Sequence, residues 1–429
     1  MSGQSGSFIA DLIASRGNPE RCRARLEVAQ LRAQEYEPWL KAFVYRPDTY
    51  DTHESVDAAA KPLAGLPFGV KDLMATHDMP TTYGSPIYRG FQPAEDAWIV
   101  ERIRHFGGIV FGKTVTTEFA WREPGPTVNP WNRLHTPGGS SSGSAAAVGA
   151  GIVPLAIGTQ TVGSVIRPAA FCGVVGYKPS HGNVSKAGVH PLAPSLDHVG
   201  FFARTVEGAA LCHALFVEAK PEVLESLDAW HTYFTAQPPR KLGVVRTPFW
   251  DRVTPQQKAS FDATLARLQA AGATWVELDP FDAMPSMLDA LQTILQVEAA
   301  RAIGPLAADY PELISAHMLA LTSAGAAVPP EKYEAALALQ ARLRSEFDGF
   351  IDGCDALVTV PATGAAPKGL ADTGDATFCA PWSFLGVPAV TVPAGQTPDG
   401  MPLGFQVLGR QGSDLLTLQT AAWIETVLG

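Results

Sequence analysis

The sequence lacks the features that mark secreted, membrane-spanning and metal-binding proteins. Its five cysteines are scattered, odd in number and without a CxxC pair, which argues against a disulfide framework or a structural zinc site. No uninterrupted apolar stretch reaches the roughly 20 residues of a membrane span. The N-terminus has neither the basic flank nor the apolar core of a signal peptide, and the ten histidines show no metal-ligand spacing. We expect a cytosolic protein with no metal and no cofactor.

Positive charge is also scarce. The chain has 32 lysines and arginines against 42 aspartates and glutamates, for a net charge of −10. An acidic chain without a basic stripe argues against nucleic acid or an anionic membrane as its main partner.

What is present is material for a large core, since 46% of the 429 residues are hydrophobic. Hydrophobic patterning predicts strands at residues 68–71, 109–111, 153–157, 242–245, 275–278, 356–360, 389–392 and 405–408. It predicts helices over most of residues 1–40 and at 96–106, 144–149, 255–271, 283–350 and 415–427, with a loop at 325–330. Alternating strands and helices indicate an α/β fold with helices on both faces of a sheet.

We interpret residues 1–429 as one domain in four consecutive parts. Residues 1–60 are N-terminal helices, and 61–210 form the core that carries the motifs. Residues 211–350 are an α/β and helical excursion that forms part of a pocket, and 351–429 are C-terminal strands and a helix.

Two short motifs are misleading in this context. GGIVFGKT at residues 107–114 matches a phosphate-binding loop, but that loop must follow a strand and open a helix. Here a helix is predicted before it and a strand within it. GSSSG at residues 139–143 matches a nucleophile elbow, but two prolines and a loop precede it where a strand is required. A Ser-His-Asp triad would also need Asp197 and His198, and adjacent strand residues cannot both point into one site.

Two Gly/Ser clusters carry the functional signal: GGSSSGS at residues 138–144 and GTQTVGS at 158–164. They bracket an Ala-rich run and can bring hydroxyls and bare backbone N–H groups into one small volume. Acyl transfer needs such a volume, because it requires a nucleophile, a proton carrier and an oxyanion site. A buried strand upstream ends at Lys71, which is a candidate base.

Read together, these segments resemble the amidase signature family. The resemblance is close over about residues 60–210 and looser over 355–425. It rests on GVKD (69–72), TTYGS (81–85), GKT (112–114), EFA (118–120), NPWN (129–132), TPGGSSSGSAAAV (136–148), GTQTVGS (158–164), RPA (167–169), GVVGYKP (173–179), SLD (195–197), GVPAVTVP (386–393) and GFQ (404–406). It implies a large, mixed, mostly parallel sheet sandwiched by helices.

The resemblance also implies a Ser–cis-Ser–Lys catalytic set. Ser164 matches the nucleophile, Ser140 the bridging serine that follows a cis peptide bond, and Lys71 the base. Burial among neutral groups would lower the pKa of Lys71 from about 10.4 in water and leave it able to accept a proton. The implied oxyanion site is made by the backbone N–H groups of Thr161, Val162, Gly163 and Ser164.

The chain departs from the family pattern beside the nucleophile. Gln160 stands where the family usually has Asp, and Val162 where it has Gly. Ile166 stands where the family has Arg, and Arg167 comes one place later. We hypothesise that the family's Asp and Arg form a charge pair that was replaced jointly here. An unpaired Arg167 buried beside Gln160 would contradict this.

The resemblance implies hydrolysis of a small amide, and the pocket residues suggest aryl or alkyl amides, with carbamates or ureas also open. The predicted pocket residues are Tyr83, Gly139, Phe378 and Trp382, with Met287, Leu291 and Leu295 from the helical excursion. The alternative is a glutamine-hydrolysing subunit of a tRNA-dependent amidotransferase. The expected partner is the small-molecule amide substrate, with the protein itself a monomer or homodimer.

Overall fold

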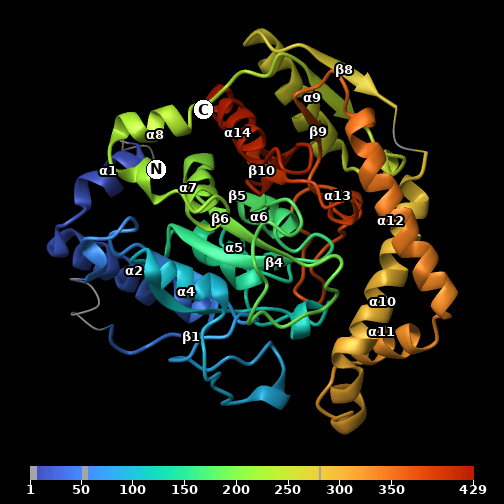
Figure 1. Cartoon of the computed structure of the whole chain (residues 1–429), viewed down its shortest axis with the longest axis horizontal. Helices are drawn as coiled ribbons and strands as arrows, with labels where there is room; N and C mark the ends of the chain where they lie inside the picture. Colours follow the sequence, from blue (N-terminus) through green and yellow to red (C-terminus); the bar gives the residue numbers. More distant parts are fainter. Residues whose placement is uncertain (1–6, 51–56, 280–281) are drawn as a thin grey trace.

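Eleven strands form one mixed sheet in the computed structural model, which describes residues 7–50, 57–279 and 282–429 (Figure 1). The first six residues of the predicted N-terminal helical region lie outside the described residues. The strands run across the sheet in the order β1 (Phe43–Tyr45), β3 (Ile109–Thr114), β2 (Pro67–Lys71), β4 (Leu155–Gln160), β6 (His198–Ala203), β5 (Val175–Lys178), β10 (Ala389–Gln396), β11 (Pro402–Leu408), β9 (Ala356–Thr359), β7 (Leu242–Val245) and β8 (Trp275–Leu278).

Helices cover both faces of this sheet. They are α1 (Phe8–Ser15), α2 (Pro19–Leu40), α4 (Trp98–His105), α5 (Ser142–Gly149), α6 (Ile166–Cys172), α7 (Val206–Phe216), α8 (Leu227–Tyr233), α9 (Pro255–Ala270), α10 (Met284–Asp309), α11 (Ala316–Ala326), α12 (Pro330–Phe350), α13 (Ala380–Leu385) and α14 (Asp414–Leu428). No helix among these described residues is long and apolar enough to span a membrane.

Side-chain alternation along β4 shows how the two faces are filled. Leu155 and Ile157 join a core cluster with α4, α7, α9 and α14, whereas Ala156 joins a cluster with α2, α5 and α6. Successive strand residues point to opposite faces, so one strand supplies both cores. The helices α10–α12, at the right of Figure 1, form a third cluster with α13. The expected helix-sandwiched mixed sheet is thus confirmed.

The sheet is less parallel than the resemblance implied. Parallel pairing is confined to two blocks, β3-β2-β4 and β9-β7-β8, and the pairs between them are antiparallel. The parallel blocks are those whose strands are joined through helices, as β7 and β8 are through α9. In the centre, β10 and β11 are joined by a short connection, which can link only antiparallel strands.

The structure bears out the interpretation of both misleading motifs. Residues 107–114 form a turn after α4 and then β3, so the apolar stretch is a strand and not a phosphate-binding loop. An irregular segment, not a strand, leads into the serines at 140–142.

Candidate active site

Lys71 is the last residue of β2 and is fully buried. Its Nζ lies 2.7 Å from the Oγ of Ser140 and 2.7 Å from the Oγ1 of Thr159. Burial lowers the pKa of Lys71 well below its usual value, and the nearby negative charge of Asp197 opposes that lowering only in part. A buried amine held by two hydroxyls is suited to accept a proton, because its neutral form is favoured.

Ser140 is held against Lys71 by the backbone that precedes it. The peptide bond between Gly139 and Ser140 is cis, as the resemblance implies. The carbonyl of Gly139 accepts a hydrogen bond of 2.6 Å from Nη2 of Arg167. A Cβ at Gly139 would lie 2.7 Å from the side chain of Thr373, so only glycine fits this close approach.

Ser164 ends a short loop, residues 161–164, between β4 and α6. Its hydroxyl forms no hydrogen bond with any residue that the structure describes, and it lines the same cavity as Ser140. The backbone N–H groups of residues 161–164 likewise have no hydrogen-bond acceptor within the described chain. A free hydroxyl beside free N–H groups is the arrangement that a nucleophile and an oxyanion site require.

Gln160 fixes the shape of this loop. Its Oε1 accepts hydrogen bonds from the N–H groups of Val165 (2.9 Å) and Ile166 (3.0 Å) at the start of α6. Its Nε2 donates to the Oγ of Ser383 at 2.9 Å, and that hydroxyl donates to the carbonyl of Val162 at 2.6 Å. The neutral amide therefore ties the strand, the loop and α13 together without a charge.

Arg167 is 6% exposed and its guanidinium is engaged elsewhere. It donates to the carbonyl of Gly374 at 2.8 Å and to the hydroxyl of Thr373 at 3.2 Å, in addition to the carbonyl of Gly139. It is thus not the unpaired neighbour of Gln160 that would contradict a joint replacement of Asp and Arg, and that hypothesis stays a prediction.

Asp197 supports the loop from the neighbouring strand. The hydroxyl of Thr161 donates to its Oδ1 at 2.6 Å, and the N–H groups of Leu192 and Ala193 donate to its Oδ2 at 3.0 Å each. Burial raises the pKa of Asp197, and the Thr161 hydroxyl is the largest influence in the opposite direction. The carboxyl group is therefore fully bonded beside Lys71.

Sequence reasoning does not assign Thr159 or Asp197 to the site, and it considers Asp197 only as part of a Ser-His-Asp triad. The antiparallel register of β4 and β6 pairs Gln160 with His198, which sets Asp197 opposite Thr161. No local pattern reveals that register, although the SLD motif marks the segment.

A cavity of about 440 Å³ opens in front of Ser140 and Ser164. One wall is apolar and comes mainly from α10, and the other is polar and comes from residues 371–377 with three arginines. The residues that define these walls are Ala120, Trp121, Arg122, Arg167, Leu192, Arg252, Leu288, Leu291, Leu295, Asp372, Thr373 and Asp375.

The structure places the predicted pocket residues in two groups. Leu291 and Leu295 line the cavity, whereas Tyr83, Gly139, Met287, Phe378 and Trp382 are not among its lining residues. Met287, Phe378 and Trp382 are each at most 1% exposed and pack in the core. Tyr83 stacks against Tyr88 and His190 instead. Large aromatic side chains gain most from burial, so their place in the core has a plain physical cause.

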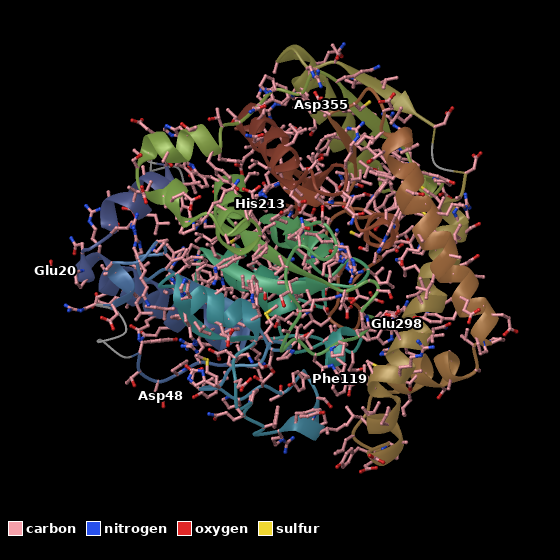
Figure 2. All side chains as sticks on the ribbon, in the orientation of Figure 1. Glu20, Asp48, Phe119, His213, Glu298 and Asp355 are labelled. Carbon is pink, nitrogen blue, oxygen red and sulfur yellow. The ribbon has the colours of Figure 1, made fainter. Side chains whose placement is uncertain are left out.

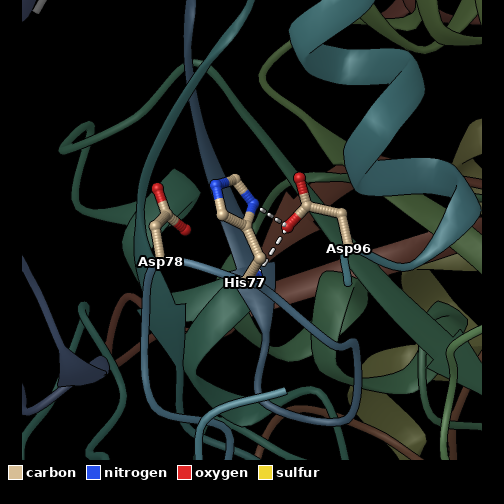
Figure 3. Close-up of side chains that lie close together, drawn as sticks. All are labelled: His77, Asp78 and Asp96. Carbon is tan, nitrogen blue, oxygen red and sulfur yellow. Dashed lines mark hydrogen bonds and ion pairs between the residues drawn. The ribbon is translucent and has the colours of Figure 1, made fainter. Parts of the chain in front are cut away.

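A separate cluster of possible metal ligands lies outside this site (Figure 3). His77, Asp78 and Asp96 can present ligand atoms within 4.8 Å of one another. The Nδ1 of His77 lies 3.0 Å from Asp96, and Arg104 forms ion pairs with Asp78 (2.7 Å) and Asp96 (2.9 Å). Because Arg104 already compensates both carboxylates, an ion-pair network accounts for the cluster.

Comparisons with known proteins agree with this geometry. The Amidase family model matches residues 25–418. The chain is 33% identical to a glutamyl-tRNA(Gln) amidotransferase subunit from Synechococcus sp. (strain CC9605), over 91% of this chain and 90% of that protein.

Solved structures resemble it along nearly the whole chain. A crystal structure of an amidase is 30% identical, with a TM-score of 0.83 and coverage of 98% of this chain and 99% of that one. The peptide amidase PAM, bound to the competitive inhibitor chymostatin, is 26% identical, with a TM-score of 0.81 and coverage of 98% and 97%. The chain therefore belongs to the amidase signature family, hydrolases that act on carbon–nitrogen bonds.

Proposed function

We propose that this protein hydrolyses the C–N bond of small amides through an acyl-enzyme on Ser164. The observation that carries the proposal is the buried Lys71, held 2.7 Å from Ser140 in the cavity that Ser164 lines. Alkyl and aryl amides are the proposed substrates, with carbamates and ureas less favoured because the cavity has no feature specific to a second heteroatom on the carbonyl.

In this mechanism the neutral amine of Lys71 takes the proton of Ser140 as Ser140 takes the proton of Ser164. The Ser164 oxygen then bonds to the carbonyl carbon, and the N–H groups of residues 161–164 hold the resulting oxyanion. The proton returns through Ser140 to the nitrogen, the C–N bond breaks and the amine leaves. Water repeats the sequence on the acyl-enzyme, which releases the carboxylic acid and restores Ser164.

A second candidate is a glutamine-hydrolysing subunit of a tRNA-dependent amidotransferase. Its support is the full-length similarity to proteins of that name. The stand-alone amidase is favoured because similarly close structural neighbours are amidases and because Gln160 replaces the Asp expected beside the nucleophile. A cytosolic location and a monomeric or homodimeric state remain predictions.

The test is ammonia or amine release by the purified protein from short primary amides, acyl anilides, aryl carbamates and glutamine. Ser164→Ala is the matched variant, and we expect it to abolish release. Release from simple amides supports the proposal. Release from glutamine but not from glutaric acid monoamide, which lacks only the α-amino group, supports the second candidate. Activity that survives Ser164→Ala would overturn the assigned nucleophile.

A further inference from the structure

The lip of the cavity is formed by a short segment whose backbone has an unusual conformation. Phe119, Ala120 and Arg122 have φ values of 45°, 65° and 38°, a left-handed region that side-chain-bearing residues rarely adopt. Phe119 is labelled in Figure 2, near α10 and α11. The carboxylate of Glu118 accepts the N–H of Ser315 at 3.1 Å, which fastens the segment to the start of α11. Such conformations persist where the surroundings impose them, and they cluster at functional sites.

This segment directs Arg122 to the cavity that holds Ser140 and Ser164. The guanidinium lies 5.0 Å from the ring centre of Trp121, which also lines the cavity. It forms no ion pair or hydrogen bond with any described residue. Arg122 therefore presents its N–H donors to whatever enters the cavity.

The other charged groups of the cavity wall are already engaged. Arg252 forms an ion pair with Asp375, and Asp372 accepts a backbone N–H of its own loop. Arg167 is bonded to carbonyls and a hydroxyl, and burial lowers its pKa, to which the like charge of Arg122 adds. In a chain with a net charge of −10, the cavity thus contains a local excess of positive charge.

An apolar wall lies in the same cavity. Leu288, Leu291 and Leu295 follow one another at helical spacing along α10, so they form a continuous stripe. A ligand that satisfies both features has an apolar chain and an anionic end.

We propose that Arg122 binds a carboxylate of the substrate, so that the preferred substrates are monoamides of short dicarboxylic acids. The apolar chain lies on the α10 leucines, the amide carbonyl lies at Ser164, and the guanidinium forms charge-assisted hydrogen bonds with the far carboxylate. This inference rests on the proposed amidase function and names its substrate class.

The experiment compares amides that differ only at the far end. Adipic acid monoamide and hexanamide have the same chain and the same leaving group, with a carboxylate in one and a methyl group in the other; glutaric acid monoamide and pentanamide form a second pair. We expect kcat/KM for the anionic member to be higher by about tenfold or more, mainly through KM, which is the scale of a charge-assisted hydrogen bond at a partly exposed site. Added salt should reduce this preference.

Variants separate the role of Arg122 from a general effect of charge. Arg122→Gln should reduce the anionic-to-neutral ratio about tenfold, Arg122→Lys should restore part of it, and Arg23→Gln, an exposed arginine on α2, should leave it unchanged. An equal ratio in the wild type, or a ratio that Arg122→Gln does not change, would overturn the inference while leaving the amidase function intact. Calorimetric binding of adipic acid monoamide to Ser164→Ala tests carboxylate recognition without turnover; hydrolysis of no amide, with no binding, would overturn both proposals.

Discussion

Two buried lysines on neighbouring strands have opposite surroundings. Lys71 on β2 and Lys113 on β3 are both fully buried, and the parallel register places Lys113 beside Val70. Lys113 lies 3.1 Å from Asp72 and also donates to the carbonyl of Met74 at 2.7 Å. Lys71 has only the hydroxyls of Ser140 and Thr159 within hydrogen-bond distance among the described residues.

The partners, not the burial, distinguish the two lysines. Burial lowers the pKa of both, but in Lys113 the carboxylate of Asp72 is the main opposing influence and stabilises the charged form. In Lys71 the opposing charge, Asp197, makes no hydrogen bond to the amine, and the lowering is larger. A charged lysine with a carboxylate supports structure, whereas a neutral lysine among hydroxyls can move a proton.

The comparison predicts a large catalytic effect at Lys71. Lys71→Met keeps the length and removes the base, so kcat/KM for a simple amide should fall by about 10²–10⁴-fold. The variant should remain folded, with an unfolding free energy within about 2 kcal/mol of the wild type, because loss of the hydrogen bonds is offset by loss of the amine's desolvation cost. Denaturant unfolding beside the activity assay checks both values. Activity within tenfold of the wild type would exclude Lys71 as the base.

The same variant has a pH signature in stability. The folded-state pKa of Lys71 lies below its unfolded value, so the unfolded chain holds a proton that the folded chain releases. The resulting penalty is fully present below the folded pKa and disappears as the pH rises through the unfolded value of about 10.4. Lys71→Met should therefore gain stability relative to the wild type at neutral pH and lose that advantage near pH 10.

At Lys113 the expected effect is on stability. Lys113→Met leaves the carboxylate of Asp72 buried without its ion-pair partner, which typically costs about 3–5 kcal/mol. The unfolding free energy should fall accordingly, and the double variant Lys113→Met/Asp72→Asn should recover part of it because no unpaired charge remains. If Lys113→Met were as stable as Lys71→Met, the distinction between the two lysines would be wrong.

Much of the fold was predictable where local signals are strong. The bounds of β7 and β8 match the predicted strands, and α9 begins at Pro255 after the predicted N-cap Thr254, whose hydroxyl accepts a hydrogen bond from Gln257. In contrast, α7 was not predicted, because nearly every one of its residues is buried and it has no polar face. The strands β5 and β6 were missed for a related reason, since their pairing partners lie elsewhere in the sequence.

The site divides in the same way. The three residues assigned through the family motifs come together in the structure, since those motifs are continuous in sequence. The cavity walls were mostly not predictable: Trp121 and Arg122 reach the cavity through positive φ values that the sequence does not signal, and the aromatic candidates Phe378 and Trp382 pack in the core.

Asp197 offers a subtler test of what sets the state of Lys71. Its negative charge raises the pKa of Lys71, so Asp197→Asn, which keeps an acceptor for the Thr161 hydroxyl, should lower that pKa further. Since the acidic limb of kcat/KM reports deprotonation of Lys71, the limb should move to lower pH. Lys186 also faces Asp197, and its charge is retained in the variant. A limb that does not move, or that moves to higher pH, would contradict this electrostatic role.

The smallest expected effect is at Thr159. Its hydroxyl orients the amine of Lys71 without contacting the reacting atoms, so Thr159→Val should lower kcat by only about 2- to 10-fold, the scale of one neutral hydrogen bond. Thr159→Ser keeps the hydroxyl and should retain most of the activity. The measurement is kcat for a neutral amide such as hexanamide, with the pH profile alongside. A loss as large as that of Lys71→Met would mean that Thr159, and not only Ser140, carries the proton, and the hydroxyl cage around Lys71 would then be part of the relay itself.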